Sequence, residues 1–198
     1  IGHTGSGKST VVNLIPRFYD ASVGQVCFLG QDVRKYRRKE LRDQIGIVPQ
    51  KAVLFAGTVR ENMQWGKKDA TDEEIWEALK TAQAEEFIRA KEGGLDANIE
   101  QGGRNLSGGQ RQRIVVARAL AMQPKIIVCL GRIAAMRLIR PDFKISCEHG
   151  QFTEKGGILF TALYHPSALL RDETKCPDTF SDLKALQSKV REVCTRTL

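Results

Sequence analysis

The sequence contains no apolar run that could cross a bilayer, since a membrane-spanning helix needs about 18 or more apolar residues in a row. No stretch has the pattern of a secretory signal peptide either. We therefore expect a chain that does not itself span a membrane. Methionine is absent from the first position, where Ile1 stands inside a recognisable motif, and we expect a fragment of a longer protein.

Paired cysteine motifs are also absent. The five cysteines are an odd number, and no two stand in the C-x-x-C arrangement that often binds metal. This pattern is typical of a reduced cytoplasmic protein, and we expect no metal site built from these side chains. The cysteines are Cys27, Cys129, Cys147, Cys176 and Cys194.

Acidic residues are fewer than basic ones. Lysine and arginine together number 31, against 23 aspartate and glutamate residues, which gives a formal net charge of +8. Such a charge suits an anionic partner, such as a nucleotide, a nucleic acid or an anionic lipid surface. A solvated basic surface is the alternative that composition leaves open.

A glycine-rich stretch at residues 2–10, Gly-His-Thr-Gly-Ser-Gly-Lys-Ser-Thr, fits the pattern G-x-x-x-x-G-K-[ST]. Glycines allow backbone N–H groups to close around the β- and γ-phosphates of a nucleotide. Lys8 adds a positive charge for those phosphates, and the Ser9 hydroxyl can ligate Mg²⁺. The candidate nucleotide-binding residues are Gly2, Thr4, Gly5, Ser6, Gly7, Lys8, Ser9 and Thr10.

The next segments predict short strands and then helices. Residues 25–30 and 45–48 are short apolar runs that favour strands, and Gln50 follows closely after the second run. Thr71 with Glu74 forms a capping-box pattern that predicts a helix start. We expect about residues 69–122 to form a mainly helical lobe.

A second candidate anion site is the Ser-Gly-Gly stretch at residues 107–109, directly before a predicted helix from Gln110 to about Met122. A serine hydroxyl, exposed N–H groups and a helix N-terminus together attract an anion. Taken alone, such a stretch is also a common helix cap.

Residues 1 to about 124 resemble the nucleotide-binding domain of an ABC transporter, and residues 48–62 resemble the exporter class. The glycine-rich loop then corresponds to Walker A and Gln50 to the Q-loop glutamine. The resemblance implies binding of ATP with Mg²⁺, which Ser9 and Gln50 would hold together with the nucleotide. The implied signature residues are Leu106, Ser107, Gly108, Gly109 and Gln110.

The same resemblance implies an α/β fold with a three-layer P-loop NTPase-like core, a parallel sheet and the inserted helical lobe. In that family, Walker A of one subunit and the signature motif of another enclose ATP, so the signature residues would act in trans. The implied partners are a second nucleotide-binding domain, in a dimer, and the transmembrane domains of an exporter. The implied location is the cytoplasm or the cytoplasmic face of the plasma membrane.

Acidic residues are missing where that family needs them. The family has a hydrophobic strand that ends in Asp-Glu, but the apolar strand predicted at residues 124–131 places Leu130 and Gly131 at these positions. Neither residue can bind a cation or accept a proton. Loss of a general base typically lowers a rate by roughly 10²–10⁴. We therefore expect ATP binding with negligible hydrolysis.

Residues 125–198 resemble the C-terminal part of an iron–sulfur uracil-DNA glycosylase, mainly through residues 124–135, His149 with Gly150, and residues 164–171. The resemblance implies a C-terminal α/β segment of glycosylase type, with DNA as a partner only under this alternative. The cysteines are not at that family's ligand spacing, so we expect no iron–sulfur cluster. The implied DNA-contacting residues are His165, Ser167, Leu169 and Arg171.

In that family the histidine at the position of His165 stabilises the charge that develops on a flipped uracil. By the same match, Ser167 would touch a phosphate, and Leu169 and Arg171 would belong to a loop that enters DNA. The residues by themselves favour another interpretation, in which His165 caps a strand end and Leu169 is core. Further on, Thr179 with Asp182 has the spacing of a capping box and predicts the start of a final helix.

The two resemblances together predict a hybrid chain, with a truncated ATP-binding domain at residues 1–124 and a glycosylase-like segment at residues 125–198. A natural fusion, an engineered chimera and an assembly artefact would all produce this sequence. The function with most motifs behind it is ATP binding as part of an ABC exporter. The alternatives are a uracil-DNA glycosylase fragment and an inactive remnant with neither activity.

Overall fold

The computed structural model describes residues 12–49 and 51–194, which form two compact units. The first unit contains the described residues up to Ile45 together with those from Lys125 onwards, and the second contains Gly46–Pro124. Within the described ranges, no helix is both long enough and apolar enough to traverse a membrane. The boundary predicted between residues 124 and 125 separates two stretches by the families that they resemble, whereas the two units are defined by packing. The predicted boundary therefore stays a prediction.

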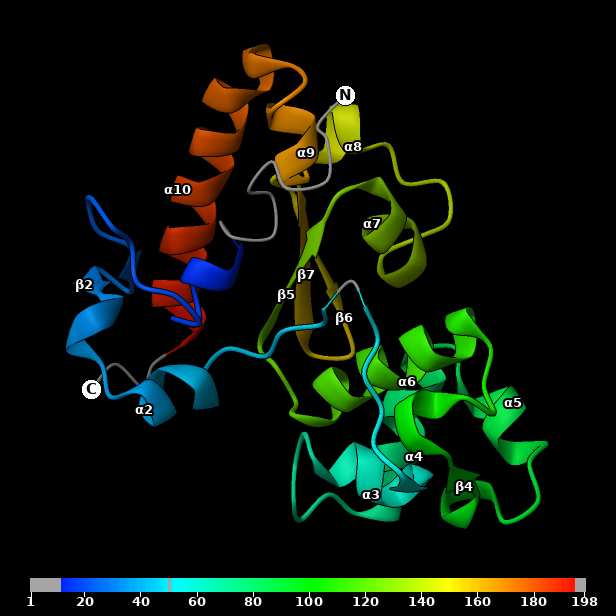
Figure 1. Ribbon diagram of the computed structural model, residues 1–198. Coiled ribbons are helices and arrows are strands. Elements are labelled where there is room, and N and C mark those ends of the chain that lie inside the picture. The colour runs from blue at the N-terminus through cyan, green and yellow to red at the C-terminus, as the bar shows by residue number, and fades with distance from the viewer. Residues whose placement is uncertain (1–11, 50, 195–198) are drawn as a thin grey trace. The chain divides into compact units, whose positions relative to one another are not determined.

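A three-stranded sheet forms the centre of the first unit (Figure 1). Its strands are β5 (Ile126–Leu130), β6 (Phe152–Lys155) and β7 (Ile158–Leu163), in the order β5-β7-β6. β5 pairs with β7 in parallel, with Ile127 opposite Phe160, and β6 pairs with β7 as an antiparallel hairpin. The apolar run predicted at residues 124–131 therefore does form a strand, because its β-branched residues fit a buried parallel pair.

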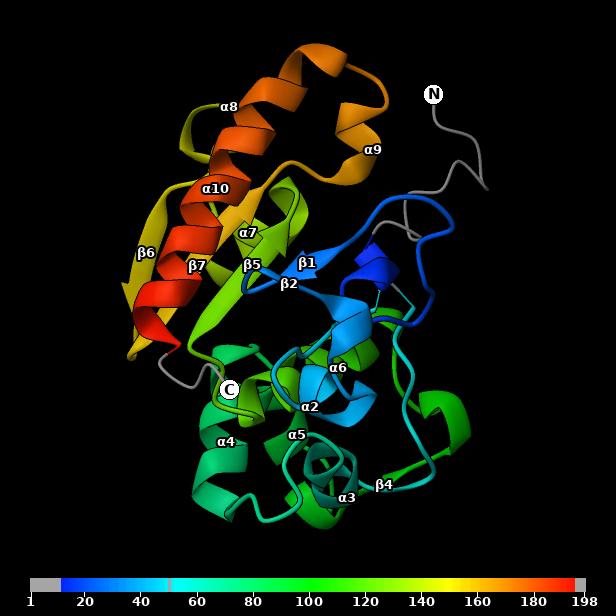
Figure 2. The same cartoon turned by 90° about the vertical axis from the view of Figure 1, so that its left-hand side faces the viewer.

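Two helices lie on opposite faces of this sheet. Figures 1 and 2 show α7 (Arg132–Leu138) on one face and α10 (Cys176–Val193) along the other. The α7 face is well packed, since Cys129 of β5, Phe160 of β7 and Ala135 of α7 belong to one buried cluster. Burial raises the pKa of the Cys129 thiol to about 12, because an apolar environment disfavours the thiolate.

Two polar contacts join α10 to the rest of this unit. Asp182 Oδ2 lies 2.7 Å from His149 Nδ1, and Lys125 Nζ donates a hydrogen bond of 2.8 Å to the carbonyl oxygen of Val193. Phe180 of this helix is 62% exposed. The final helix predicted from Thr179 exists, but it begins earlier, because Pro177 near its start fixes a helical φ. Asp182 therefore pairs with His149 rather than completing a capping box.

The remaining elements of the first unit are short. Residues 25–30 were expected to be one strand, but the chain reverses there between β1 (Cys27–Phe28) and β2 (Gln31–Asp32). Leu29 and Gly30 both have positive φ, which is the geometry of a tight hairpin turn. Further short helices of this unit are α2 (Arg38–Asp43), α8 (Ile145–Glu148) and α9 (Pro166–Leu169), and 3-10 turns lie at Val33–Lys35 and Glu173–Lys175.

The second unit is mainly helical. Its strands are β3 (Gly57–Thr58) and β4 (Asn98–Ile99), and its helices are α3 (Val59–Gln64), α4 (Asp72–Thr81), α5 (Glu85–Arg89) and α6 (Gly108–Ala121). α3 and α4 pack against α6, with Met63, Ile75 and Ile114 fully buried. Thr71 and Glu74 form the expected capping box at the start of α4.

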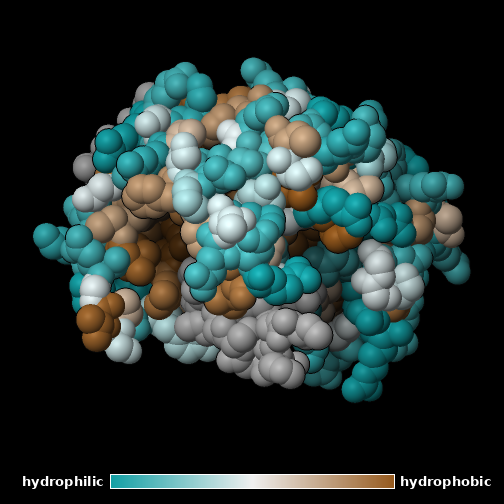
Figure 3. Space-filling model, turned by 90° about the horizontal axis from the view of Figure 1, so that it is seen from above, coloured by the Kyte–Doolittle hydropathy of each residue, from teal (hydrophilic) through white to brown (hydrophobic). Residues whose placement is uncertain are grey.

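Residues 45–48, expected to be a strand, have no regular secondary structure, and Val48 is 38% exposed. No neighbouring strand among the described residues pairs with this run, and a single apolar run cannot form a strand without one. On the face drawn in Figure 3, hydrophilic residues cover most of the surface and hydrophobic residues gather in separate patches.

Candidate functional site

The first predicted site lies outside the described residues. This applies to the glycine-rich loop, to the Q-loop glutamine and therefore to the proposed Mg²⁺ contacts of Ser9 and Gln50. Their roles stay predictions. The residues concerned are Gly2, Thr4, Gly5, Ser6, Gly7, Lys8, Ser9, Thr10 and Gln50.

The signature stretch forms the N-terminus of α6. Ser107 is the N-cap residue, and its Oγ accepts a hydrogen bond of 3.2 Å from the N–H of Gln110. In return, Gln110 Oε1 accepts a bond of 2.9 Å from the N–H of Ser107, which completes a capping box. The side chain of Gln110 is thus used to fix the helix start.

The two signature glycines present open backbone to solvent. Gly108 and Gly109 are exposed, and a Cβ atom placed on Gly109 would meet nothing within 4 Å. The first N–H groups of a helix have no partner inside the helix, and since Ser107 takes that of Gln110, those of Gly108 and Gly109 are the ones available to an anion. The sequence placed Ser107, Gly108 and Gly109 at a helix start, and the structure brings them together there.

The loop before α6 is fastened by two side chains. Asn105 donates a hydrogen bond of 2.8 Å to the carbonyl oxygen of Asn98 and accepts one of 3.1 Å from the N–H of Glu100. Arg111 Nη1 donates to two carbonyl oxygens of this loop, at 2.6 Å from Leu106 and 3.1 Å from Gly103. The sequence motif did not single out Arg111, because its partners depend on how the loop folds back onto the helix.

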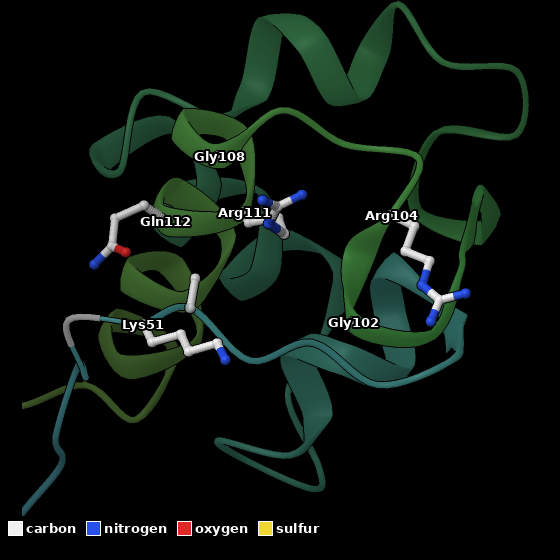
Figure 4. Close-up of a pocket in the computed structure, with 7 residues that line it drawn as sticks. Lys51, Gly102, Arg104, Gly108, Arg111 and Gln112 are labelled. Atoms are coloured by element: carbon white, nitrogen blue, oxygen red, sulfur yellow. The ribbon is translucent and has the colours of Figure 1, made fainter.

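A cationic pocket of about 410 Å³ opens beside the start of α6. Figure 4 shows Gly108, Arg111 and Gln112 on the helix, while Lys51 and Arg104 come from two other segments. Three of the lining residues are cationic, and none carries a carboxylate. Such a lining favours an anionic ligand. The full lining consists of Lys51, Ala52, Gly102, Arg104, Gly108, Arg111 and Gln112.

Residues on both sides of Gln50 in the sequence contact the signature helix. Gln112 Nε2 donates to the carbonyl oxygen of Pro49 at 3.4 Å, and Arg118 Nη2 donates to that of Val53 at 3.0 Å. Desolvation by burial lowers the pKa of Arg118 from its ordinary value. Pro49 and Val53 therefore both accept hydrogen bonds from side chains of α6.

The carboxyl end of β5 carries no acid. Leu130 pairs with Leu163, and the N–H of Gly131 donates to the carbonyl oxygen of Leu163 at 2.8 Å. Gly131 has a φ of +88°, and a Cβ atom there would lie 3.1 Å from the Cβ atom of His165. Both features favour glycine at this position, because any other residue would be strained at this φ and would require a small shift of His165.

The residues implied by the glycosylase resemblance form a local cluster. His165 is the N-cap of α9, and its Nδ1 accepts a hydrogen bond of 3.1 Å from the N–H of Ser167. Ser167 Oγ lies 2.7 Å from the same nitrogen, and Arg171 Nε donates to the carbonyl oxygen of Ser167 at 3.1 Å. Leu169 ends α9 and is partly buried. His165 thus has a capping role, and its part in DNA binding stays a prediction.

A third cluster was not recognised from the sequence. His149 lies against Tyr164, with ring centroids 4.8 Å apart, and pairs with Asp182 of α10. No signal in the sequence joined His149 to Asp182, because they are 33 positions apart and on different elements. In the part of the chain that the structure describes, no three His, Cys, Asp or Glu side chains are grouped as a metal site would require.

The comparisons with known proteins agree with the signature site. The ABC transporter family model matches residues 1–129, and this match ends inside β5. An uncharacterized ABC transporter ATP-binding protein of Mycobacterium tuberculosis is 47% identical over 148 residues, which are 73% of this chain and 25% of that protein. The putative multidrug export ATP-binding/permease protein YgaD of Bacillus subtilis is 47% identical over 138 residues, which are 70% of this chain and 24% of that protein.

A solved structure gives the same result for the fold. The structure of a bacterial Atm1-family ABC exporter with ATP bound matches 69% of this chain and 24% of that chain, with a TM-score of 0.62 and 37% sequence identity. The chain therefore belongs to the ABC transporter family. It is homologous to the ATP-binding domain of exporter-type ATP-binding/permease proteins. It spans about a quarter of the length of the curated relatives that it matches.

Proposed function

We propose that the chain binds ATP as a partial nucleotide-binding domain of an ABC exporter. The observation that carries this proposal is the signature stretch, which caps α6 with Ser107 and opens Gly108 and Gly109 to solvent beside a cationic pocket. That arrangement fits the phosphates of a nucleotide, because unpaired N–H groups and positive side chains stabilise negative charge.

The roles follow the family resemblance. Lys8 and the other Walker A residues would hold the phosphates, and Ser9 and Gln50 would hold Mg²⁺ with the nucleotide. When bound, Mg²⁺ would neutralise phosphate charge. Ser107, Gly108 and Gly109 would contact the nucleotide held by a second nucleotide-binding domain. The partners would then be this second domain and the transmembrane domains of an exporter, at the cytoplasmic face of the plasma membrane.

Hydrolysis is expected to be negligible. The acidic pair of the family falls on Leu130 and Gly131, which have no group that binds a cation or accepts a proton. The geometry at Gly131 agrees with this, since its backbone is packed against His165. The chain would therefore act through nucleotide binding rather than through turnover.

A calorimetric titration of the chain with Mg-ATP tests the proposal. We expect saturable binding in the unaltered chain and loss of at least about tenfold in affinity for Lys8→Ala, because a charge-assisted contact to phosphate contributes roughly 1.5–3 kcal/mol. Lys39→Ala is the matched control, since Lys39 is exposed on α2 and pairs only with Asp43. Absence of ATP binding by the unaltered chain would refute the proposed function.

A second candidate is a fragment of a uracil-DNA glycosylase. The observation in its favour is the position of His165 and Ser167, which follow β7 at the carboxyl end of the parallel pair β5 and β7. A fragment without the remaining catalytic motif is expected to be inactive. Incubation with uracil-containing single-stranded DNA should therefore yield no abasic sites. Excision of uracil that is lost in a His165→Ala variant would overturn this expectation.

The division at residues 124 and 125 would reflect a join between two genes. Reads that cross the corresponding codons in genomic DNA test this proposal. Continuous coverage from one molecule would favour a natural fusion, and a break in coverage would favour an artefact. If neither ATP nor uracil-DNA is bound while the chain still melts cooperatively, an inactive remnant would be the better conclusion.

A further inference from the structure

We propose that Arg111 is the positioning residue of the signature stretch, which it holds in the form that faces a nucleotide phosphate. This inference rests on the proposed function, because it assigns Arg111 a role in the same site. Arg111 lines the cationic pocket, but its Nη1 is directed to two carbonyl oxygens of the loop, so we assign it a role in positioning the loop. Neither the motif nor the family comparison assigns it this role.

The contacts of Arg111 enclose the loop at two points. Its Nη1 donates to the carbonyl oxygens of Gly103 and Leu106, at 3.1 and 2.6 Å. Its alkyl part lies over Gly103, since a Cβ atom on that glycine would come within 2.8 Å of Arg111 Cδ. One side chain in the first turns of α6 thus fixes both ends of the four-residue stretch that leads into Ser107.

The loop needs such a restraint because it is rich in glycine. Gly102 and Gly103, before the signature stretch, both have positive φ. Gly108 and Gly109 follow directly after Ser107. Glycine loses more conformational freedom on ordering than any other residue. A guanidinium that binds two carbonyl oxygens lowers the number of conformations open to the loop, so the N–H groups of Gly108 and Gly109 are already directed outward when a ligand arrives.

The competing explanation is that Arg111 stabilises the unit and nothing more. Arg113 offers a direct comparison, because it lies two residues further along α6 and also donates to a backbone carbonyl, that of Gln83, at 2.8 Å. It additionally covers the ring of Phe87, at 4.9 Å from the ring centroid. Arg113 therefore makes a similar structural contact away from the signature stretch.

The experiment compares Arg111→Met, Arg111→Lys and the control Arg113→Met in the full chain. Methionine keeps most of the alkyl packing and removes the donors, whereas lysine keeps a charge and N–H donors on a single nitrogen but lacks the planar guanidinium. Three quantities are measured: the thermal midpoint, hydrogen exchange of the peptide that covers residues 103–110, and the ATP dependence of self-association in sedimentation. ATP binding by the monomer is measured in parallel, together with the Lys8→Ala variant.

We expect both methionine variants to lower the midpoint by similar amounts. Only Arg111→Met should accelerate exchange in residues 103–110, by about tenfold. It should also weaken ATP-dependent self-association by about tenfold, with unchanged ATP binding by the monomer. Arg111→Lys should recover part of both effects. Equal exchange and equal self-association in Arg111→Met and Arg113→Met would overturn the proposal.

Failure of the proposed function gives a different result. If the unaltered chain neither binds ATP nor associates with it, the proposed function is wrong, and the exchange measurement still decides whether Arg111 orders the loop. If the chain binds ATP but Arg111→Met leaves exchange and association unchanged, the proposed function stands and the role of Arg111 is rejected.

Discussion

The start of α6 and the end of β5 are the two places where an ABC-type ATPase would need specific side chains, and they differ in what they retain. At the start of α6, Ser107 and Gln110 form a reciprocal cap and two glycines face solvent. At the end of β5, the strand is present and paired, but Leu130 and Gly131 occupy the positions where the family resemblance places carboxylates. The start of α6 has both the expected backbone element and the expected side chains. The end of β5 has the expected strand but lacks the carboxylates.

This difference shows that a strand can occupy the expected position without the catalytic groups of its family. β5 is specified by buried apolar residues, such as Cys129, that pack against α7 and β7. Those contacts do not depend on which side chains follow the strand. The signature stretch is different, because its side chains Ser107 and Gln110 are themselves part of the helix cap. Loss of the signature residues would change the fold locally, whereas loss of the acidic pair does not.

The largest expected effect is that of an acid introduced at the end of β5. Gly131→Glu should lower the free energy of unfolding by about 3 kcal/mol, because the φ of 88° and ψ of 169° at this position are almost confined to glycine and cost other residues about 1–3 kcal/mol, and overpacking adds about 1–3 kcal/mol. The crowding comes from His165, 3.1 Å from the position of the new Cβ atom. Urea denaturation measures the change, and no ATP hydrolysis should appear.

Gly156→Glu is the matched control for this substitution. Gly156 also has positive φ, at +57°, but a Cβ atom there would meet nothing within 4 Å. We expect it to cost only about 1–2 kcal/mol, from the backbone conformation. Equal decreases in the free energy of unfolding in the two variants would show that the end of β5 accommodates a side chain. The end of β5 would then differ less from the start of α6.

A smaller effect on stability is expected from the titration of the Cys129 thiol. The pH dependence of unfolding reports how well water is excluded from β5. Burial raises the pKa of this thiol in the folded chain to about 12, above its ordinary value of 9.0. The folded state therefore holds the proton more tightly than the unfolded state does. The contribution of this group to stability is fully present below about pH 9 and is lost as the pH rises toward 12.

Denaturation at several pH values between 8 and 11 tests this expectation. The free energy of unfolding of the unaltered chain should fall more steeply above about pH 9 than that of Cys129→Ala. Cys147→Ala should retain the steeper fall, because Cys147 is exposed. The same slope in all three chains would mean that β5 is open to water at Cys129, contrary to its 2% exposure.

The sequence predicted those features whose cause lies within a few residues. The cap at Thr71 and the start of α6 at Ser107 depend on partners three positions away, so local patterns were sufficient. Apolar character alone also predicted β5. Residues 25–30 were harder, because a tight turn at Leu29 and Gly30 divides a run that looks continuous in composition.

Contacts between distant parts of the chain could not be predicted from local patterns. His149 and Asp182 meet only because α10 lies along the sheet, and this overrode the cap predicted for Asp182. Arg111 is a similar case, since its acceptors lie on a loop that must first fold back toward α6. The sequence placed His149 in a family resemblance and Asp182 in a capping-box pattern, whereas the actual partners of these side chains are determined by tertiary structure.

The smallest effect on stability is expected at the start of α6. A comparison of two capping residues there separates a loss of stability from a loss of ligand contact. Ser107→Ala and Thr71→Ala each remove the side-chain oxygen of a capping box, so each should lower the free energy of unfolding by about 1 kcal/mol. Only Ser107→Ala should also weaken ATP-dependent self-association, because α4 lies outside the proposed contact. Denaturation and sedimentation of both variants measure the two effects. Weakened association in both would mean that stability alone controls it, and that the signature serine has no separate role.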